Sequence, residues 1–257
     1  MFYTRKCGEI EESDFGSEQT LCGWLQDTRN LGGIAFLQLR DITGVIQLTL
    51  LKKKLDADDY KKWTNINRES IVLVRGIVKE NKEAPGGVEM LPDNIELLNE
   101  AETPLPLGVI DKIDSEIETR LNARYLDLRK SEIAANFQIR AAVSGAVHKH
   151  LRREKFLEVQ TPKIIASATE GGTSLFEMKY FDKTAYLAQS PQLYKQMLMG
   201  GGLERVYEIG PAFRAEEHNT PRHLNEFISI DIEMSFADDD VVMGVLDILV
   251  DSAAIAV

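Results

Sequence analysis

The sequence predicts an α+β protein with an all-β module at its N-terminal end, followed by a larger region of helices and long strands. From Thr20 to Ile95, short runs of β-branched and large apolar residues alternate with glycine-containing turns. Beyond this stretch the periodicity becomes helical in places, and the strand-like runs become longer. A chain of 257 residues has room for one large or two medium domains and for a sizeable core.

The N-terminal module, residues 1–100, is predicted to be a five-stranded barrel. Its strand-like runs are separated by the turn signals NLGG, ITG and APGG, and one short helical segment precedes the fourth run. The five runs are LCGWLQDTR, IAFLQLRDI, GVIQLTLL, SIVLVRGIVKE and VEMLPDNIELL. Three strands, a helix and two more strands is the order of an OB barrel, and another small β-barrel is the alternative at this point.

A linker is predicted over residues 101–122, where prolines and turn-forming residues interrupt any periodicity. The second domain, residues 123–257, is predicted to begin with a long amphipathic helix. The apolar positions of this helix are Ile133, Phe137, Val143, Val147 and Leu151.

The rest of the second domain is predicted to contain mainly antiparallel strands. KFLEVQTPKI has the pattern of a strand that stops at Pro162, and YLAQSPQLYKQMLM that of a strand, a turn and a helix. RVYEIGPAFRAEE and NEFISIDIEMSFAD are expected to form a long hairpin with EEHNTPRHL at its tip. The last run, VVMGVLDILVDSAAIAV, is helical and apolar without a stop signal, so we expect the domain to continue beyond Val257.

Composition and charge exclude several classes of protein. The net charge of −11 argues against a protein that coats nucleic acid through many phosphate contacts, although local cations can still serve a protein that reads a few exposed bases. No apolar run is long enough to span a bilayer and no signal peptide is recognisable, so we expect a cytoplasmic protein with no membrane partner. Cys7 and Cys22 are then reduced thiols rather than a disulfide or a zinc site.

The hairpin segment FRAEEHNTPRHLNEF gathers groups that suit a nucleoside triphosphate. Arg214 and Phe227 lie on neighbouring predicted strands, where the guanidinium suits a phosphate oxygen and the ring suits a planar base. Glu216 can accept from an exocyclic amine, and His223 can meet a second phosphate. The alternatives are a cross-strand ion pair of Arg214 with Glu216 and a core position for Phe227. Because no Walker or GxGxxG loop is present, a P-loop or Rossmann site is excluded.

The spacing F-R-x-E, a short loop and H-x-x-x-F resembles motif 2 of the class II aminoacyl-tRNA synthetases. HLRREKFLEVQTP resembles their motif 1, with Lys155 where a glycine is usual. RYLDLR at 124–129, with GW, LRD and IQ in the barrel, resembles the aspartate–asparagine–lysine subgroup. TEGGTSLF at 169–176 and QSPQLYKQ at 189–196 resemble aspartate enzymes of the archaeal and eukaryotic type within it. The resemblance covers the chain from Leu21 onward.

This resemblance implies an ATP site built on motif 2, in which Arg214, Glu216 and His223 are catalytic. Arg214 would grip the α-phosphate and the amino-acid carboxylate, and Glu216 would lie near the adenine and the tRNA end. His223 would meet the γ-phosphate, Arg222 would belong to the same ATP site, and Phe227 would stack on the adenine.

The resemblance also implies an aspartate site. Lys195 would pair with the side-chain carboxylate of the substrate, a buried cation that neutral asparagine would leave unpaired. Gln192 and Asp231 would surround the amino group, and Glu170 would lie on the loop that closes over the amino acid. The reaction implied is attack of the aspartate carboxylate on the α-phosphorus of ATP, assisted by Mg²⁺, and transfer of the aspartyl group to the 3′ end of a tRNA.

In the barrel, the resemblance implies an anticodon site. Phe36 would stack on the middle base and Gln47 would bond to it, while Arg29 would contact bases or phosphate. A core position is the alternative for Phe36. Archaeal relatives that charge only aspartate tRNA carry tryptophan and lysine where this chain has Gln26 and Pro85, which implies relaxed use of tRNA(Asp) and tRNA(Asn).

Motif 3 of the family, with its acidic Mg²⁺ ligands, has no counterpart before Val257, so half of the catalytic site and no metal ligand are expected within this chain. The family further implies a homodimer formed through the helix at 131–153 and the strand after it. Two alternatives remain. An asparagine enzyme is disfavoured by Lys195, and a noncatalytic RNA-binding protein is favoured by the missing motif 3 but opposed by the intact motif 2.

Overall fold

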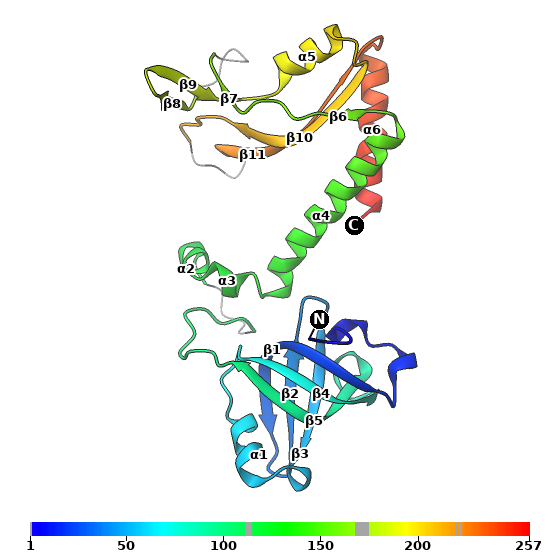
Figure 1. Ribbon diagram of the computed structural model, residues 1–257, viewed down its shortest axis with the longest axis vertical. Helices are drawn as coiled ribbons and strands as arrows, with labels where there is room; N and C mark the ends of the chain where they lie inside the picture. The colour runs from blue at the N-terminus through cyan, green and yellow to red at the C-terminus, as the bar shows by residue number, and fades with distance from the viewer. Residues whose placement is uncertain (1, 111–114, 168–174, 219, 221–222) are drawn as a thin grey trace. The chain divides into compact units, whose positions relative to one another are not determined.

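In the computed structural model the chain forms two compact units, Met1–Ile133 and Ala134–Val257 (Figure 1). The structure describes residues 2–110, 115–167, 175–218, 220 and 223–257. One large hydrophobic cluster lies within the first unit and another within the second. The predicted domain boundaries near residues 100 and 122 remain predictions, since the contacts divide the chain after Ile133.

The first unit is built around a closed barrel with the strand order β1-β2-β3-β5-β4. Its strands are β1 (Glu18–Asn30), β2 (Ile34–Arg40), β3 (Val45–Leu51), β4 (Ile71–Glu80) and β5 (Val88–Asn99). Helix α1 (Ala57–Thr64) connects β3 to β4, and Asp56 caps it by accepting from the backbone N–H of Asp59. This arrangement confirms the predicted five-stranded OB barrel.

Strand alternation separates the barrel core from its outer face. On β2, Ala35, Leu37 and Leu39 point into the core and are buried, whereas Phe36 and Gln38 are half-buried on the outside. Phe36 is not part of the core cluster, which contains Leu37 and its inward-facing neighbours. The alternative of a core position for Phe36 is therefore wrong, and its ring is available on the outer face.

Two short helices, α2 (Ile117–Asn122) and α3 (Arg124–Asp127), follow the barrel. The end of the predicted linker is thus helical, which its low periodicity did not indicate. Asp127 is fully buried and accepts from Arg120 Nε at 2.9 Å, and it also pairs with Arg124. The hydrogen bond from Arg120 lowers the pKa of Asp127 although burial opposes this. In RYLDLR, Asp127 therefore holds two cations in place.

In the second unit, a sheet of order β11-β10-β6 lies beside a smaller sheet of order β7-β9-β8. The strands are β6 (Leu157–Glu158), β7 (Ile164–Ile165), β8 (Glu177–Tyr180), β9 (Lys183–Leu187), β10 (Arg205–Phe213) and β11 (Glu226–Met234). The helices are α4 (Ser131–Arg153, which begins in the first unit), α5 (Gln192–Gly200) and α6 (Asp239–Ile255). The strand expected over 155–164 is only the two-residue β6, with β7 beyond Pro162, and β8 was not predicted.

Helices α4 and α6 pack together against one face of the β10–β11 hairpin (Figure 1). Val147 and Leu151 of α4 meet Leu249 of α6 and the buried ring of Tyr207 from β10. Because strand side chains alternate between faces, the opposite face of the hairpin carries Glu208, Asp231 and Glu233, together with Phe227. Asp238 caps α6 by accepting from the N–H of Val241.

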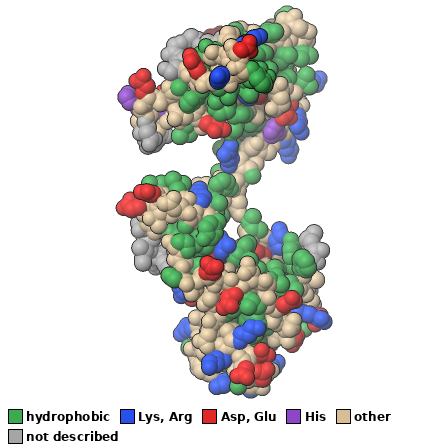
Figure 2. Space-filling view, turned by 60° about the vertical axis from the view of Figure 1, so that its left-hand side comes forward, with side chains coloured by type: hydrophobic (Ala, Val, Ile, Leu, Met, Phe, Trp, Pro, Cys, Tyr) green, Lys and Arg blue, Asp and Glu red, His purple; other side chains and the backbone are tan. Residues whose placement is uncertain are grey.

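Charge is mixed on the barrel surface. On the face shown in Figure 2, acidic and basic side chains are interspersed over the first unit rather than gathered in one basic patch. Among the described residues, no helix is both long and apolar enough to cross a bilayer.

Candidate active site and anticodon-type face

The register of the β10–β11 hairpin places the predicted site residues on one face. Glu208 pairs with Asp231, and Ala212 pairs with Phe227. Side chains two residues apart share a face, so Arg214, at the end of β10, lies on the same side as Phe227 and Asp231. This is the face opposite Tyr207 and the packed helices.

Arg214 and Phe227, predicted to lie on neighbouring strands, contact each other. The guanidinium carbon lies 5.3 Å from the ring centroid, within cation–π range. The backbone N–H of Arg214 donates to the carbonyl of Asn225, which fixes the start of the loop. Arg214 Nε is buried and has no hydrogen-bond partner among the residues that the structure describes. A buried donor without a partner is costly, so this atom is suited to an acceptor on a ligand.

The loop at the tip of the hairpin is more open. Glu216 is half-buried, and its backbone N–H donates to Asn225 Oδ1 at 3.0 Å. Among the residues that the structure describes, no ion pair joins Arg214 to Glu216. His223 is exposed, and its Nδ1 is 2.7 Å from Thr220 Oγ1. Arg222 lies outside the described residues, as does Glu170.

Lys195 is the buried cation of the site. Its ammonium lies 3.3 Å from Asp231 Oδ1 and 3.5 Å from Glu233 Oε2, and it donates to the carbonyl of Ile232 at 3.2 Å. Gln192, one turn earlier on α5, donates to Glu233 Oε2 at 3.4 Å. The structure thus brings together Gln192, Lys195 and Asp231, and it adds Glu233, which the sequence analysis did not single out.

A second buried carboxylate lies on the same face and was also missed. Glu208 is 1% exposed, and it accepts from the backbone N–H and the hydroxyl of Thr161. Lys163 completes the group with an ion pair of 2.7 Å to Glu208. The alternation of β10 is the signal that places Glu208 beside Asp231. Because Glu208 is paired with Lys163, Lys195 pairs with the two neighbouring carboxylates, Asp231 and Glu233.

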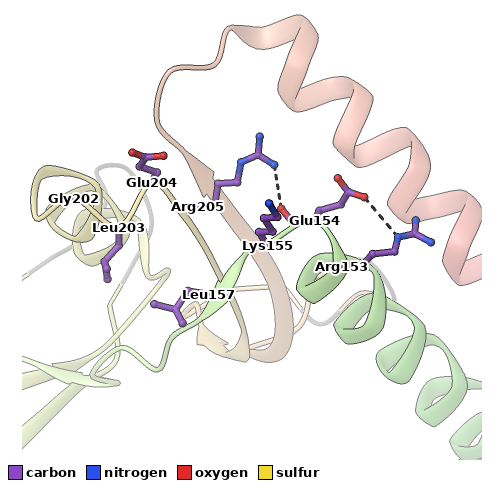
Figure 3. Close-up of a pocket in the computed structure, with 8 residues that line it drawn as sticks. All are labelled: Arg153, Glu154, Lys155, Leu157, Gly202, Leu203, Glu204 and Arg205. Carbon is purple, nitrogen blue, oxygen red and sulfur yellow. Dashed lines mark hydrogen bonds and ion pairs between the residues drawn. The ribbon is translucent and has the colours of Figure 1, made fainter.

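A large surface cleft in the second unit, of about 640 Å³, contains none of these residues. It lies at the end of α4, where Arg205 Nη1 donates to the carbonyl of Glu154 at 3.1 Å (Figure 3). Lys155 lines it with a φ of +62°, the left-handed conformation that explains why a glycine is usual at this position of motif 1.

On the barrel, the predicted anticodon readers share the outer face of β1, β2 and β3. Arg29 pairs with Phe36, and Gln38 pairs with Gln47 on the next strand. Arg29 is exposed, while Phe36 and Gln47 are half-buried. A flat ring with amide and guanidinium groups around it suits an unstacked base.

Glu89 of β5 supports Gln47 and was not predicted. This buried carboxylate accepts from Gln47 Nε2 at 3.2 Å, Thr49 Oγ1 at 2.6 Å and Asn81 Nδ2 at 2.9 Å. Lys79 pairs with it at 2.9 Å. Burial opposes ionisation of Glu89, but these hydrogen bonds outweigh it and lower the pKa of the carboxyl group.

Gln26 and Pro85 lie at separate irregularities of the barrel. The pairing of β1 with β2 shifts register between Leu25 and Asp27, so Gln26 is the extra residue of a β-bulge. Pro85 is exposed and begins the short helical turn Pro85–Gly87 between β4 and β5. A β-bulge redirects side chains, and this bulge places the side chain of Gln26 beside Gln38 on the outer face of the barrel.

An OB barrel followed by a unit with this hairpin site is the architecture expected of a class II aminoacyl-tRNA synthetase. Comparison of the sequence with known families supports this class. Residues 116–257 match the family described as tRNA synthetases class II (D, K and N), and residues 19–98 match the OB-fold nucleic acid binding domain. The chain belongs to this class II synthetase family.

Two relatives within this family show how similar the sequences are. The chain is 57% identical over 233 residues to an aspartate–tRNA(Asp/Asn) ligase of Methanopyrus kandleri, covering 90% of this chain and 54% of the relative. It is 50% identical over 251 residues to an aspartate–tRNA(Asp) ligase of Thermococcus kodakarensis, covering 97% of this chain and 57% of the relative. The chain therefore spans little more than half the length of these relatives.

Solved structures share the fold. Asparaginyl-tRNA synthetase of Pyrococcus horikoshii, complexed with asparaginyl-adenylate, superimposes with a TM-score of 0.92 at 32% identity, covering 100% of this chain and 58% of that one. Aspartyl-tRNA synthetase of Entamoeba histolytica gives a TM-score of 0.79 at 30% identity, covering 94% and 52%.

Proposed function

We propose that the chain is part of an aspartate–tRNA ligase, which activates L-aspartate with ATP and transfers it to tRNA. The observation that carries the proposal is the buried ammonium of Lys195, held by Asp231 and Glu233 on the same sheet face as Arg214 and Phe227. A cation in this position favours a substrate with a second carboxylate. Neutral asparagine would bring no carboxylate to that cation, and the high identity to aspartate ligases supports the same choice.

The side chains suggest how the first step proceeds. Phe227 stacks on the adenine, and the guanidinium of Arg214 bridges the α-phosphate and the carboxylate that attacks it. Lys195 orients the aspartate side chain, while Gln192 and Asp231 bind its amino group. The α-carboxylate oxygen forms a bond to the α-phosphorus as the bond to pyrophosphate breaks, giving aspartyl-adenylate. In the second step the 3′-hydroxyl oxygen of tRNA forms an ester bond to the aspartyl carbonyl carbon as the bond to the AMP phosphate breaks, and the hydroxyl proton passes to the departing phosphate.

The roles of Glu216, His223, Arg222 and Glu170 remain proposals drawn from the family resemblance. So does Mg²⁺, which would neutralise phosphate charge in this chemistry. Across the part of the chain that the structure describes, no group of three or more histidine, cysteine, aspartate or glutamate side chains is placed to hold a metal ion. No step is assigned to the ion.

For tRNA, we propose that the outer face of the barrel reads the anticodon through Arg29, Phe36 and Gln47. With Gln26 and Pro85 in place of tryptophan and lysine, both tRNA(Asp) and tRNA(Asn) are proposed partners. Six relatives at 50–57% identity are named as tRNA(Asp/Asn) ligases, which supports the relaxed type. A homodimer formed through α4, and a cytoplasmic location, are part of the same proposal.

Aspartate-dependent exchange between ATP and pyrophosphate tests the activation step. We expect exchange with aspartate and none with asparagine, measured both for the 257-residue chain and for the chain extended through motif 3. Exchange only in the extended chain places the remaining groups of the site beyond Val257. Absence of exchange in both would contradict the proposed activity and favour a noncatalytic RNA-binding protein.

A further inference from the structure

The side chain of Gln26 is fixed by a hydrogen bond from Arg40. Arg40 Nη1 donates to Gln26 Oε1 at 3.2 Å, and Gln26 Nε2 donates to Gln38 Oε1 at 3.4 Å. A guanidinium has only donors, so the atom of Gln26 that faces it must be the carbonyl oxygen. The amide therefore has a defined orientation, with its oxygen occupied and its N–H groups directed away from Arg40.

Arg40 is itself fixed by a buried carboxylate. Its two terminal nitrogens donate to the two oxygens of Glu69 at 3.1 and 2.7 Å, a bidentate arrangement with little freedom. Glu69 is 4% exposed and adopts a φ of +69°, and its backbone N–H donates to the carbonyl of Leu25, next to the bulge. Arg129 also donates to Glu69, at 2.9 Å, and lies over the ring of Trp24. A non-glycine residue in this conformation persists only where its surroundings fix it.

The same end of the barrel carries the turn at Pro85. Arg40 pairs with Val45 across β2 and β3. The carbonyl oxygen of Val45 is 4.0 Å from where a Cβ on Gly86 would stand. Arg40 thus bonds to Gln26, and its strand partner Val45 lies near the turn that contains Pro85; Gln26 and Pro85 are the two positions that distinguish this chain from relatives restricted to aspartate tRNA.

We propose that Arg40, locked by Glu69, is a positioning residue for tRNA choice, which fixes Gln26 as a hydrogen-bond donor toward RNA. This inference rests on the proposed reading of an anticodon by the barrel. The anticodons of aspartate and asparagine tRNAs differ only in the third base, cytosine or uracil. Both pyrimidines carry the same carbonyl at ring position 2 and differ at positions 3 and 4. The side-chain amide of Gln26, whose orientation is fixed, can donate to this shared carbonyl and so accepts either base.

A double-mutant cycle tests this mechanism. We would measure the affinity of the full 257-residue chain for two labelled anticodon stem–loop RNAs, with anticodons GUC and GUU, by fluorescence anisotropy. Arg40→Lys keeps a positive charge beside Glu69 but loses the fork that reaches Gln26. We expect it to weaken binding of both RNAs about two- to tenfold, the range of one hydrogen bond. In a Gln26→Ala background the same substitution should have no further effect.

Two further variants make the outcome decisive. Arg75→Lys is the matched control, because Arg75 pairs with Glu18 at 2.7 Å on an exposed part of the barrel, and its affinity should equal that of the unmodified chain. Gln26→Glu keeps an acceptor for Arg40 but has no donor and adds a negative charge, so it should bind both RNAs at least as weakly as Gln26→Ala. If thermal unfolding shows that Arg40→Lys does not fold, the Gln26→Glu variant still tests the proposal.

Each outcome has one meaning. Additive losses in the cycle, or a Gln26→Glu variant that binds like the unmodified chain, would overturn the positioning role while leaving anticodon binding intact. An unmodified chain that prefers one RNA more than about tenfold, roughly 1.4 kcal/mol, would overturn the shared-carbonyl mechanism. An unmodified chain that binds neither RNA would overturn the proposed anticodon reading, and the inference with it.

Discussion

Replacing Lys195 by methionine perturbs the proposed amino-acid site at its centre. Methionine retains much of the length of the lysine stem and removes only the charge and the donors. The Lys195 side chain is 4% exposed, whereas its partners Asp231 and Glu233 are 20% and 22% exposed. The substitution therefore leaves two partly buried carboxylates close together without a cation, and the carbonyl of Ile232 loses a donor.

The expected loss of stability follows from these contacts. Removing one partner of a buried ion pair costs about 3–5 kcal/mol. Because water still reaches a fifth of each carboxylate, we expect the lower end, about 3 kcal/mol. For a domain of this size that corresponds to a fall of roughly 6–12 °C in the unfolding temperature. Lys183→Met, an exposed lysine on β9, is the matched control and should change stability by less than about 0.5 kcal/mol.

Activity should fall by more than stability alone explains. Loss of a buried charge partner costs a bound ligand about 2–5 kcal/mol, so kcat/KM for aspartate in pyrophosphate exchange should fall about a hundredfold. The preference for aspartate over asparagine should fall with it, because the cation is what separates the two substrates. The assay is run on the extended chain if only that form exchanges. A folded Lys195→Met variant that retains its aspartate preference would refute the reasoning.

Three other predictions concern the barrel and the helix packing. Phe36→Ala should weaken binding of an anticodon stem–loop RNA by about 1–3 kcal/mol through lost stacking, measured by anisotropy, and an unchanged affinity would exclude its ring from the interface. Glu89 has a lowered folded pKa, so its stabilisation is complete above its unfolded pKa of about 4.3 and is lost as the pH falls through the folded value. Thermal unfolding from pH 7 to pH 3 should therefore show a steeper loss of stability than in Glu89→Gln, and parallel curves would contradict this. Leu151→Ala should cost about 2–5 kcal/mol in chemical denaturation because Leu151 is fully buried, whereas Leu193→Ala, 47% exposed, should cost far less; equal costs would contradict the packing described.

Local periodicity was sufficient to predict most of the fold. The alternation of apolar and polar residues along β2 and β3 predicted the barrel strands, whereas it left open whether Phe36 faces the core or the outside. The apolar spacing through Val147 and Leu151 gave α4, and the two long strands gave the hairpin. In each case the pattern extends over many residues, so one exception does not change the interpretation.

The parts that could not be predicted depend on contacts between distant residues. Glu89 binds Gln47 across 42 positions of sequence, and Arg129 binds Glu69 across 60. The bulge at Gln26 appears only when β1 is paired with β2, because one strand alone does not reveal which residue is extra. For the same reason the two-residue β6 and the unpredicted β8 depend on partners rather than on their own propensity.

The β10–β11 hairpin also explains how one unit accommodates both an apolar core and a charged site. Tyr207 faces the packed helices, while Glu208, the next residue, faces the candidate site. The two residues are adjacent on one strand, yet Tyr207 takes part in helix packing whereas Glu208 binds Thr161 and Lys163 on the other face. Two-residue alternation therefore divides the hairpin into a face that holds the unit together and a face that is free to bind a charged substrate.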